Sequence, residues 1–190
     1  MLTADRLRSA YAQGMFPMVH DDGELWWHDP DPRAIIPLDN IAPNARLQRY
    51  IRSHMYRFTI DACFPEVMRR CADRAETWLD ERMIAAYTAL HEQGDAHSVE
   101  CWHAEELIGG IYGVCIGTAF FGESMFSRAN NASTAAFHSL VAHLRTHGCT
   151  LFDTQYINDH TRRLGAIEIP RAEFRKRLAA ARTGPAIRWS

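Results

Sequence analysis

The chain has 190 residues, 47% of them hydrophobic, and a formal net charge of −2 at pH 7. This length suits one globular domain with at most a small appendage, and the balanced charge excludes a strongly basic nucleic-acid binder but not a local basic patch. Five cysteines without a C-x-x-C pair indicate reduced thiols, and no apolar run is long enough to span a membrane. The first residues lack the apolar stretch of a signal peptide, so we expect a cytoplasmic protein.

The first sixty residues alternate between helix signals and loop signals. Thr3 is a good N-cap for a first helix, and Gly14 is a typical residue to follow its end. The next segment is crowded with Pro, Asp and Trp, and we interpret it as an ordered loop that packs Trp26 and Trp27. We predict a helix over 3–13, an ordered loop over 15–37 closed by a short strand over 34–38, a helix over 44–54 and a strand over 56–60.

The remaining residues show longer periodic stretches. Pro65 suits the first position of a helix, and Asp80 suits the cap of a longer one. From residue 97 the apolar period changes to two, which is typical of consecutive strands joined by short turns. The adjacent Gly109 and Gly110 indicate a bulge or a close backbone approach to a ligand. We predict helices over 65–74, 80–94, 132–147 and 170–182, and strands over 98–103, 107–116, 118–123 and 151–157.

This order of elements predicts a mixed α/β (α+β) fold, with helices followed by an antiparallel meander and then by a helix and a strand. We place a small N-terminal lobe over residues 1–60 and a larger domain over residues 61–190.

Three polar residues stand out as candidates for chemistry. Glu123 lies among aromatic residues at the end of a predicted strand, where a carboxylate needs a partner or changes its pKa. Asp153 and Gln155 lie two positions apart on another predicted strand, so they should face the same side. An exposed polar face on an edge strand would explain the same pattern. The histidines show no zinc-ligand spacing, so we interpret them as surface residues, and no nucleophile elbow or phosphate loop is visible.

Several longer segments resemble one family, the leucyl/phenylalanyl-tRNA–protein transferases. The similarity extends over nearly the whole chain in the right order. It is carried by Tyr11-x-x-Gly14-x-Phe16-Pro17, Trp26-Trp27-x-x-Pro30-Asp31-Pro32-Arg33, His97-Ser98-Val99-Glu100, Gly109-Gly110-Ile111-Tyr112-Gly113-Val114, the segment from Phe121 to Arg128, Asn131-Ala132-Ser133, Asp153-x-Gln155-x-x-Asn158-Asp159-His160, Leu164-Gly165-Ala166 and Ile169-Pro170-Arg171.

The resemblance implies a core like that of the GCN5-related N-acetyltransferases, preceded by a smaller N-terminal domain. It implies transfer of Leu, Phe or Met from aminoacyl-tRNA to proteins with N-terminal Arg or Lys, which marks them for degradation through the N-degron pathway. It also implies no metal and no organic cofactor, and we expect a monomer. The chain begins almost at the first helix, where the family usually has a further Gly-rich segment, so we expect either a shortened lobe or a misassigned start codon.

The resemblance also assigns roles to individual residues. Gln155 would orient the attacking amine or relay its proton, although an amide acts only by hydrogen bonding. Asp153 would hold Gln155, attract the cationic substrate or accept the proton. Alternatively, both residues only bind the substrate. Glu123 would lie at the rim of the pocket, or would simply stabilise its loop.

An apolar pocket for the transferred side chain is implied at Ile111, Phe120, Phe137 and Leu140, although ordinary core residues have the same chemistry. Tyr11 is also expected to bind the substrate. Trp78 matches one position that stacks on the terminal adenine of the tRNA, whereas Met18 stands where the family often has Trp.

Arg46, Arg49 and Arg52 recur every three residues on one predicted helix, a spacing wide enough to contact a phosphate backbone. A solvated helix face would show the same spacing, and a similarly placed basic cluster in the family favours tRNA binding. Two other functions remain open at this point. One is an acetyl-CoA-dependent N-acyltransferase, and the other is a non-catalytic tRNA-binding module.

Overall fold

The computed structural model describes residues 2–20, 22–52, 55–73, 77 and 79–189, and the side chains of residues 46, 50 and 52 lie outside that description. Its helices are α1 (Ala4–Ala12), the 3₁₀ helix η1 (Leu38–Asn40), α2 (Ala45–Arg52), α3 (Phe64–Ala72), α4 (Glu81–Glu92), α5 (Ala132–Thr146), α6 (Asp159–Arg163) and α7 (Arg171–Ala181). Its strands are β1 (Phe16–Val19), β2 (Leu25–His28), β3 (Arg33–Ile36), β4 (Arg57–Ile60), β5 (Ala96–His103), β6 (Glu106–Ile116), β7 (Ala119–Ser127), β8 (Leu151–Gln155) and β9 (Ile167–Ile169).

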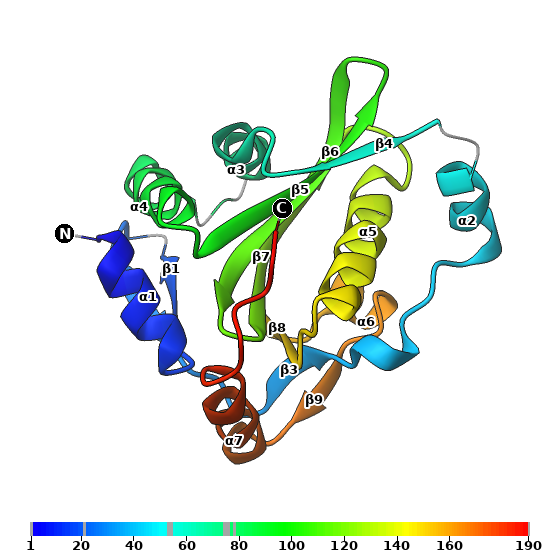
Figure 1. Cartoon of the computed structure of the whole chain (residues 1–190). Helices are drawn as coiled ribbons and strands as arrows, with labels where there is room; N and C mark the ends of the chain where they lie inside the picture. Colours follow the sequence, from blue (N-terminus) through cyan, green and yellow to red (C-terminus); the bar gives the residue numbers. More distant parts are fainter. Residues whose placement is uncertain (1, 21, 53–54, 74–76, 78, 190) are drawn as a thin grey trace.

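A seven-stranded sheet forms the centre of the molecule, in the order β4-β5-β6-β7-β8-β3-β9 (Figure 1). The strands β5 to β7 form the predicted antiparallel meander, and β4 pairs antiparallel to β5 at its edge. After the crossover through α5, β8 pairs parallel to β7. The mixed sheet with its helices confirms the expected α/β (α+β) class. The strands β3 and β4 come from the first sixty residues and pair into this sheet, while the division at residue 60 stays a prediction.

The sheet separates two hydrophobic clusters. One contains residues of α1, α3, α4 and α7 together with Tyr112, Val114 and Phe121 of the sheet. The other contains residues of α2 and α5 with Ile111, Cys115 and Phe120, and Figure 1 shows these two helices together on one side. Neighbouring residues along β6 and β7 thus point to opposite clusters, as strand geometry requires.

Local sequence signals explain where the helices begin. The side chain of Thr3 accepts a hydrogen bond from the backbone N–H of Arg6, and that of Asp80 accepts one from Met83, which confirms both predicted caps. Gly109 lies beside a register shift between β5 and β6, and a side chain there would collide with Ala132 at the start of α5. The predicted close approach at this glycine is therefore made by a helix.

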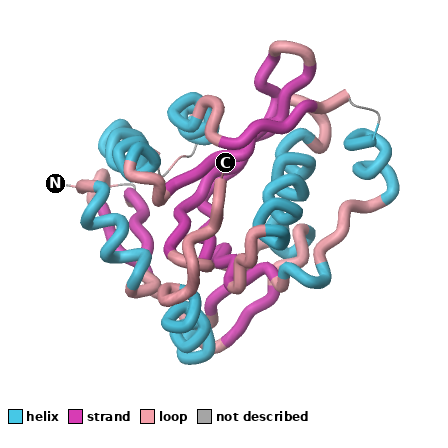
Figure 2. The backbone as a smooth tube through the Cα atoms, viewed as in Figure 1, coloured by secondary structure: helices cyan, strands magenta, loops and turns pink. Residues whose placement is uncertain are grey.

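The segment predicted as a loop over 15–37 is the main correction to the expected elements. It contains the antiparallel hairpin β1–β2 (Figure 2), in which Met18 pairs with Trp26 and Pro17 with Trp27. Each strand has only four residues, which is too short for a clear alternating pattern. The short elements α6 and β9 were also not expected.

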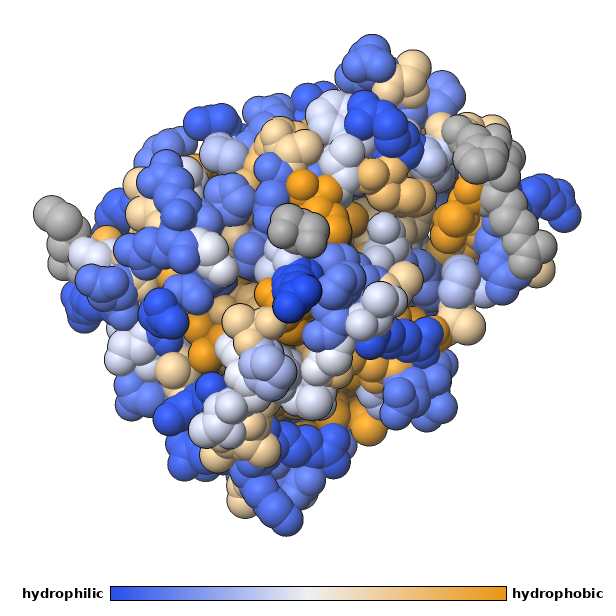
Figure 3. Space-filling view, viewed as in Figure 1, coloured by the Kyte–Doolittle hydropathy of each residue, from blue (hydrophilic) through white to orange (hydrophobic). Residues whose placement is uncertain are grey.

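The surface in Figure 3 is mostly hydrophilic, with smaller hydrophobic areas between charged side chains. All five cysteines are free thiols, as their spacing predicted. Among the helices in the described ranges, none is both long and apolar enough to cross a membrane.

Candidate active site

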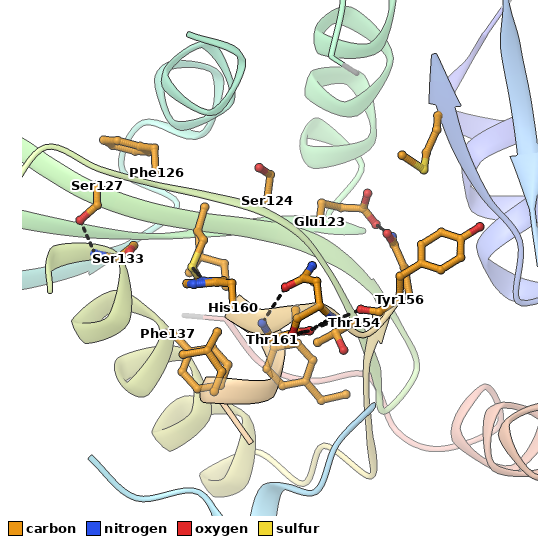
Figure 4. A pocket seen from close by; sticks show the side chains of 18 residues that line it. Glu123, Ser124, Phe126, Ser127, Ser133, Phe137, Thr154, Tyr156, His160 and Thr161 are labelled. Carbon is orange, nitrogen blue, oxygen red and sulfur yellow. Dashed lines mark hydrogen bonds between the residues drawn. The ribbon is translucent and has the colours of Figure 1, made fainter. Parts of the chain in front are cut away.

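A cavity of about 500 Å³ opens where the parallel strands β7 and β8 part. The two strands pair from Ala119 and Leu151 as far as Phe121 and Asp153, and the chain beyond those residues forms the walls of the gap. Its lining comes from β6, β7, β8, α5, α6, the hairpin and the chain around α6: Met18, Ile111, Gly122, Glu123, Ser124, Met125, Phe126, Ser127, Ser133, Phe137, Phe152, Thr154, Gln155, Tyr156, Asn158, His160, Thr161 and Leu164. Figure 4 shows Glu123 on one side of this space and Phe137 on the other.

The carboxylate of Glu123 is surrounded by hydrogen-bond donors. Oε1 accepts from the hydroxyl of Tyr11 at 2.6 Å and from Nε2 of Gln155 at 2.8 Å, and Oε2 lies 3.4 Å from the hydroxyl of Tyr87. The two tyrosine hydroxyls also contact each other. Three separate elements, α1, α4 and β8, thus converge on one carboxylate at the edge of the cavity.

Burial changes the acid–base properties of this group. Removal from water raises the pKa of Glu123 to about 7, although the hydrogen bonds from Tyr11 and Gln155 act to lower it. Burial, followed by the charge of Glu123, holds the pKa values of Tyr11 and Tyr87 well above the usual value for tyrosine. The tyrosines therefore stay protonated as donors, while Glu123 exchanges its proton near neutral pH.

Asp153 is fully buried and faces Arg33 rather than the cavity. Arg33 donates from Nε to Oδ1 at 2.8 Å and from Nη2 to Oδ2 at 2.6 Å, which is a bidentate ion pair. The guanidinium is itself fully buried and lies between the rings of Phe16 and Phe174. Burial acts to lower the pKa of Arg33, but the neighbouring Asp153 and Asp29 outweigh it and raise this pKa above its usual value, so the guanidinium keeps its charge.

Gln155 lines the cavity in an unusual backbone conformation. Its φ is +67°, a left-handed value that few residues other than glycine adopt, and its backbone N–H donates to Oδ1 of Asp153 at 3.0 Å. The pairing of β8 with β3 shifts register at this point. Simple strand alternation therefore fails here, because Thr154 and Gln155 both line the cavity whereas Asp153 does not.

The apolar residues predicted for a pocket fall into two groups. Ile111 and Phe137 line the cavity, whereas Phe120 and Leu140 are buried in the core outside the lining. The ring of Phe152 lines the cavity and contacts both Phe120 and Phe137. The sequence analysis assigned no role to Phe152 or Tyr87, and Arg33 entered it only as the last residue of a segment that resembles the family. Each of these residues acts through neighbours distant in the chain.

Met18 lines the cavity, and its cross-strand partner Trp26 is 57% exposed beside it. Trp78 lies outside the described residues. Of the arginine cluster, the structure describes the side chain of Arg49, which is exposed on α2, while those of Arg46 and Arg52 are outside the description. The proposed contacts of these residues with tRNA stay predictions.

The expectation of surface histidines is wrong for His97. This residue is buried and stacks on Trp189, because its two ring nitrogens find oxygen partners in Asp61, at 2.7 Å, and in the carbonyl of Gly94, at 3.0 Å. His91 joins Asp61 and His97 in a group whose ligand atoms lie within 4.8 Å of one another. The ring of His91 hydrogen-bonds to the carbonyl of Ala96, and Asp61 accepts a hydrogen bond from the backbone N–H of Ser98. This group therefore connects β5 to the neighbouring segments.

Comparisons with known proteins match most of the chain to one family. Residues 35–179 match the model of the family described as leucyl/phenylalanyl-tRNA protein transferase, and residues 1–31 match the model of its N-terminal domain. A solved structure of L-PGS from Bacillus licheniformis aligns with 76% of this chain and 48% of its own, with 14% identity and a TM-score of 0.46.

Curated relatives named leucyl/phenylalanyl-tRNA–protein transferase match almost from end to end. The relative from Salinibacter ruber is 50% identical over 95% of this chain and 80% of its own, and that from Gloeobacter violaceus is 46% identical over 95% and 94%. The relative from Ruegeria pomeroyi is 47% identical over 97% of this chain and 89% of its own. The sequence segments, the matching models and these relatives together place the chain in the leucyl/phenylalanyl-tRNA–protein transferase family, a family of aminoacyltransferase enzymes.

Proposed function

We propose that the protein transfers Leu, Phe or Met from aminoacyl-tRNA to the N-terminal Arg or Lys of other proteins. We further propose that it works in the cytoplasm as a monomer and that its products enter the N-degron pathway. The family supports the reaction type, and the cavity supports the donor, because a mainly apolar space beside a carboxylate suits an uncharged side chain next to a reacting amine.

The observation that carries the proposal is the position of Glu123. Among the described residues that line the cavity it is the only carboxylate, and its pKa of about 7 suits a group that accepts and returns a proton near neutral pH. Oε1 is occupied by two donors, so Oε2 is the oxygen better placed to receive the proton.

The reaction is aminolysis of an ester. The neutral α-amine attacks the ester carbonyl, a C–N bond forms, the C–O bond to the ribose breaks, and the amine nitrogen loses a proton. Glu123 would accept this proton and deliver one to the departing ribose oxygen. Gln155 gives an N–H to Glu123, so its amide oxygen is the group that would orient the attacking amine.

Asp153 has a different role from Glu123 in this proposal. Its charge is matched by Arg33 and its two oxygens are occupied, so it would act through Gln155 rather than by accepting a proton itself. Ile111 and Phe137 would hold the transferred side chain, with Phe120 and Leu140 supporting them from the core. Met18, Trp78 and Tyr11 stay the proposed contacts toward the donor, and Arg46, Arg49 and Arg52 toward the tRNA backbone.

The decisive experiment supplies labelled Leu-tRNA together with peptides that begin with Arg, Lys, Asp or Ala. We expect label on the Arg and Lys peptides only, because the negative charge of Glu123 favours a cationic N-terminal residue. Equal labelling of the Asp peptide would contradict the acceptor class. Binding of tRNA without any transfer would indicate a binding module, and transfer from acetyl-CoA would indicate an acetyltransferase.

A further inference from the structure

We infer that Arg33 is a positioning residue for the transfer reaction, because one buried guanidinium holds two of the three backbone segments that present hydrogen-bond donors to Glu123, those of Tyr11 and Gln155. This inference rests on the proposed function and deepens it. Arg33 lies on β3, 120 positions from Asp153 in the sequence, yet it contacts the segments that carry Tyr11 and Gln155.

The first connection runs toward Gln155. The fork of Arg33 fixes both oxygens of Asp153, and Oδ1 of Asp153 also accepts the backbone N–H of Gln155. That hydrogen bond stabilises the left-handed conformation of Gln155, with φ +67°, which costs free energy for a residue with a side chain. In this conformation Nε2 of Gln155 reaches Glu123 at 2.8 Å.

The second connection runs toward Tyr11. Nη1 of Arg33 donates to the carbonyl of Gly14 at 2.8 Å, and the N–H of Gly14 donates to the carbonyl of Tyr11 at 2.9 Å. Gly14 has φ +85°, so the chain turns sharply there at the end of α1. The hydroxyl of Tyr11 then reaches the same oxygen of Glu123, at 2.6 Å.

The surroundings of Arg33 favour a precise role over general support. A lysine would carry the same charge but has no fork, so it cannot hold two oxygens of Asp153 and the carbonyl of Gly14 at once. The rings of Phe16 and Phe174 lie 4.9 and 4.3 Å from its central carbon and keep the guanidinium in place. The donors on Tyr11 and Gln155 are thus positioned by a rigid, buried support.

Arg33→Lys is the first test. We expect kcat to fall by about 100-fold with both Leu-tRNA and a minimal aminoacyl-adenosine donor, because a misplacement of about 1 Å at the reacting groups has an effect of this size. The KM for Leu-tRNA should stay within about twofold of the wild type, since Arg33 is buried outside the cavity lining. The matched control is Leu144→Ala, a core truncation at the far end of α5, which should lower stability and leave kcat unchanged.

The double variant Arg33→Met with Asp153→Asn guards against misfolding, because it removes both buried charges while Asn keeps an oxygen for the N–H of Gln155. It should fold and still show the loss in kcat. A folded double variant with wild-type kcat would overturn the inference. The inference would also be overturned if neither Arg33→Lys nor the double variant unfolded cooperatively. The ion pair of Arg33 and Asp153 would then be needed for the fold as a whole.

A readout independent of transfer separates this inference from the proposed function. The titration of Glu123 can be followed by carbon NMR of its labelled carboxyl group in wild-type and Arg33→Lys protein. Looser donors and a less neutralised Asp153 both act to raise the pKa of Glu123, so its midpoint should move to higher pH in the variant. An unchanged midpoint would overturn the role of Arg33, whereas absence of transfer by the wild type would overturn the function alone.

Discussion

Glu123 and Asp153 show how two carboxylates in one site acquire different properties. Asp153 is buried beside a cation that matches its charge, while Glu123 is partly buried among neutral donors at the cavity. Hydrogen bonds from neutral groups offset only part of the loss of hydration, so Glu123 holds its proton more tightly than an ordinary glutamate. The environment, rather than the residue type, assigns the proton-accepting role.

The rate of transfer should therefore depend on pH through Glu123. With its pKa at about 7, the carboxylate form needed to accept a proton increases as the pH rises through neutrality, so kcat should rise between about pH 6 and pH 8 and then level off. Glu123→Gln should lose about 100-fold in kcat and should no longer show this rise. Single-turnover measurements with preformed Leu-tRNA over this range check both points.

Deacylation of the donor needs its own control at each pH, since the ester hydrolyses faster in alkali. A Glu123→Gln variant that keeps both its rate and its pH dependence would show that the ester reacts without help from this group.

Phe137 should influence which amino acid is transferred. It lines the cavity opposite Glu123, so Phe137→Ala should enlarge the space and shift the preference among Leu, Phe and Met toward the largest side chain. Competition between differently charged tRNAs measures the ranking. Leu144→Ala destabilises a comparable part of the core without touching the cavity, and should leave the ranking unchanged. A preserved ranking in Phe137→Ala would make this residue part of the core only.

At the scale of elements, the sequence predicts the helices and strands that repeat a hydrophobic pattern over several turns or several strand pairs. The helices α4 and α5 and the meander β5 to β7 show their periods clearly, and Thr3 and Asp80 mark helix starts. The hairpin β1–β2 and the short elements α6 and β9 do not, because three to five residues are too few to show a period. Length thus decides what periodicity can detect.

The site was only partly predictable for a related reason. Glu123, Gln155 and Ile111 lie in segments whose resemblance to a family is visible in the sequence, and the same resemblance implies Phe137 as a pocket residue. The left-handed backbone of Gln155 has no local signal, since it depends on a register shift against β3. The pairing of Arg33 with Asp153 joins residues 120 positions apart, which no local pattern encodes.

The helix α2 should contribute to tRNA binding through its arginines. Replacing Arg46, Arg49 and Arg52 together by Ala should weaken binding of Leu-tRNA and make its salt dependence shallower, by a slope of about 0.7 to 0.9 for each phosphate that is no longer neutralised. Reaction with a minimal aminoacyl-adenosine donor should be unchanged, because that donor lacks the phosphate backbone. Binding measured across a range of salt concentrations gives the slope.

Arginines paired with carboxylates provide the control for that experiment. A variant with Arg69, Arg175 and Arg177 replaced by Ala loses the same formal charge, but each of these residues lies within 4.0 Å of an acidic partner. Equal changes of slope in the two triple variants would indicate an effect of net charge alone, and α2 would then be a solvated face.

At the scale of the whole molecule, the site lowers stability above neutral pH. The folded protein binds a proton at Glu123 with a pKa of about 7, while the unfolded chain does so near 4.5. Between pH 4.5 and pH 7 the folded state binds more protons than the unfolded chain. The contribution of Glu123 to the free energy of unfolding is therefore largest in acid and is lost as the pH rises from 4.5 through 7. A pKa of about 7 in the folded protein against 4.5 in the unfolded chain corresponds to a full loss of about 3 kcal/mol.

This loss of stability comes from the carboxyl group of Glu123 alone, so it can be measured by comparing the wild type with Glu123→Gln. The variant should gain stability relative to the wild type as the pH is raised from about 4 to about 8, measured by urea unfolding at each pH. A constant difference between the two proteins across this range would show that Glu123 titrates as an ordinary exposed glutamate.

The place of β3 in the sheet has a consequence for how the chain is made. This strand leaves the ribosome early, but its two neighbours, β8 and β9, are among the last segments to be translated. Until they emerge, β3 has no partner on either edge, and such long-range pairing is slow to form. Arg33 therefore lacks its ion-pair partner Asp153 during most of synthesis. A nascent chain should acquire its catalytic geometry only near completion, so a partly translated enzyme cannot modify the proteins emerging beside it.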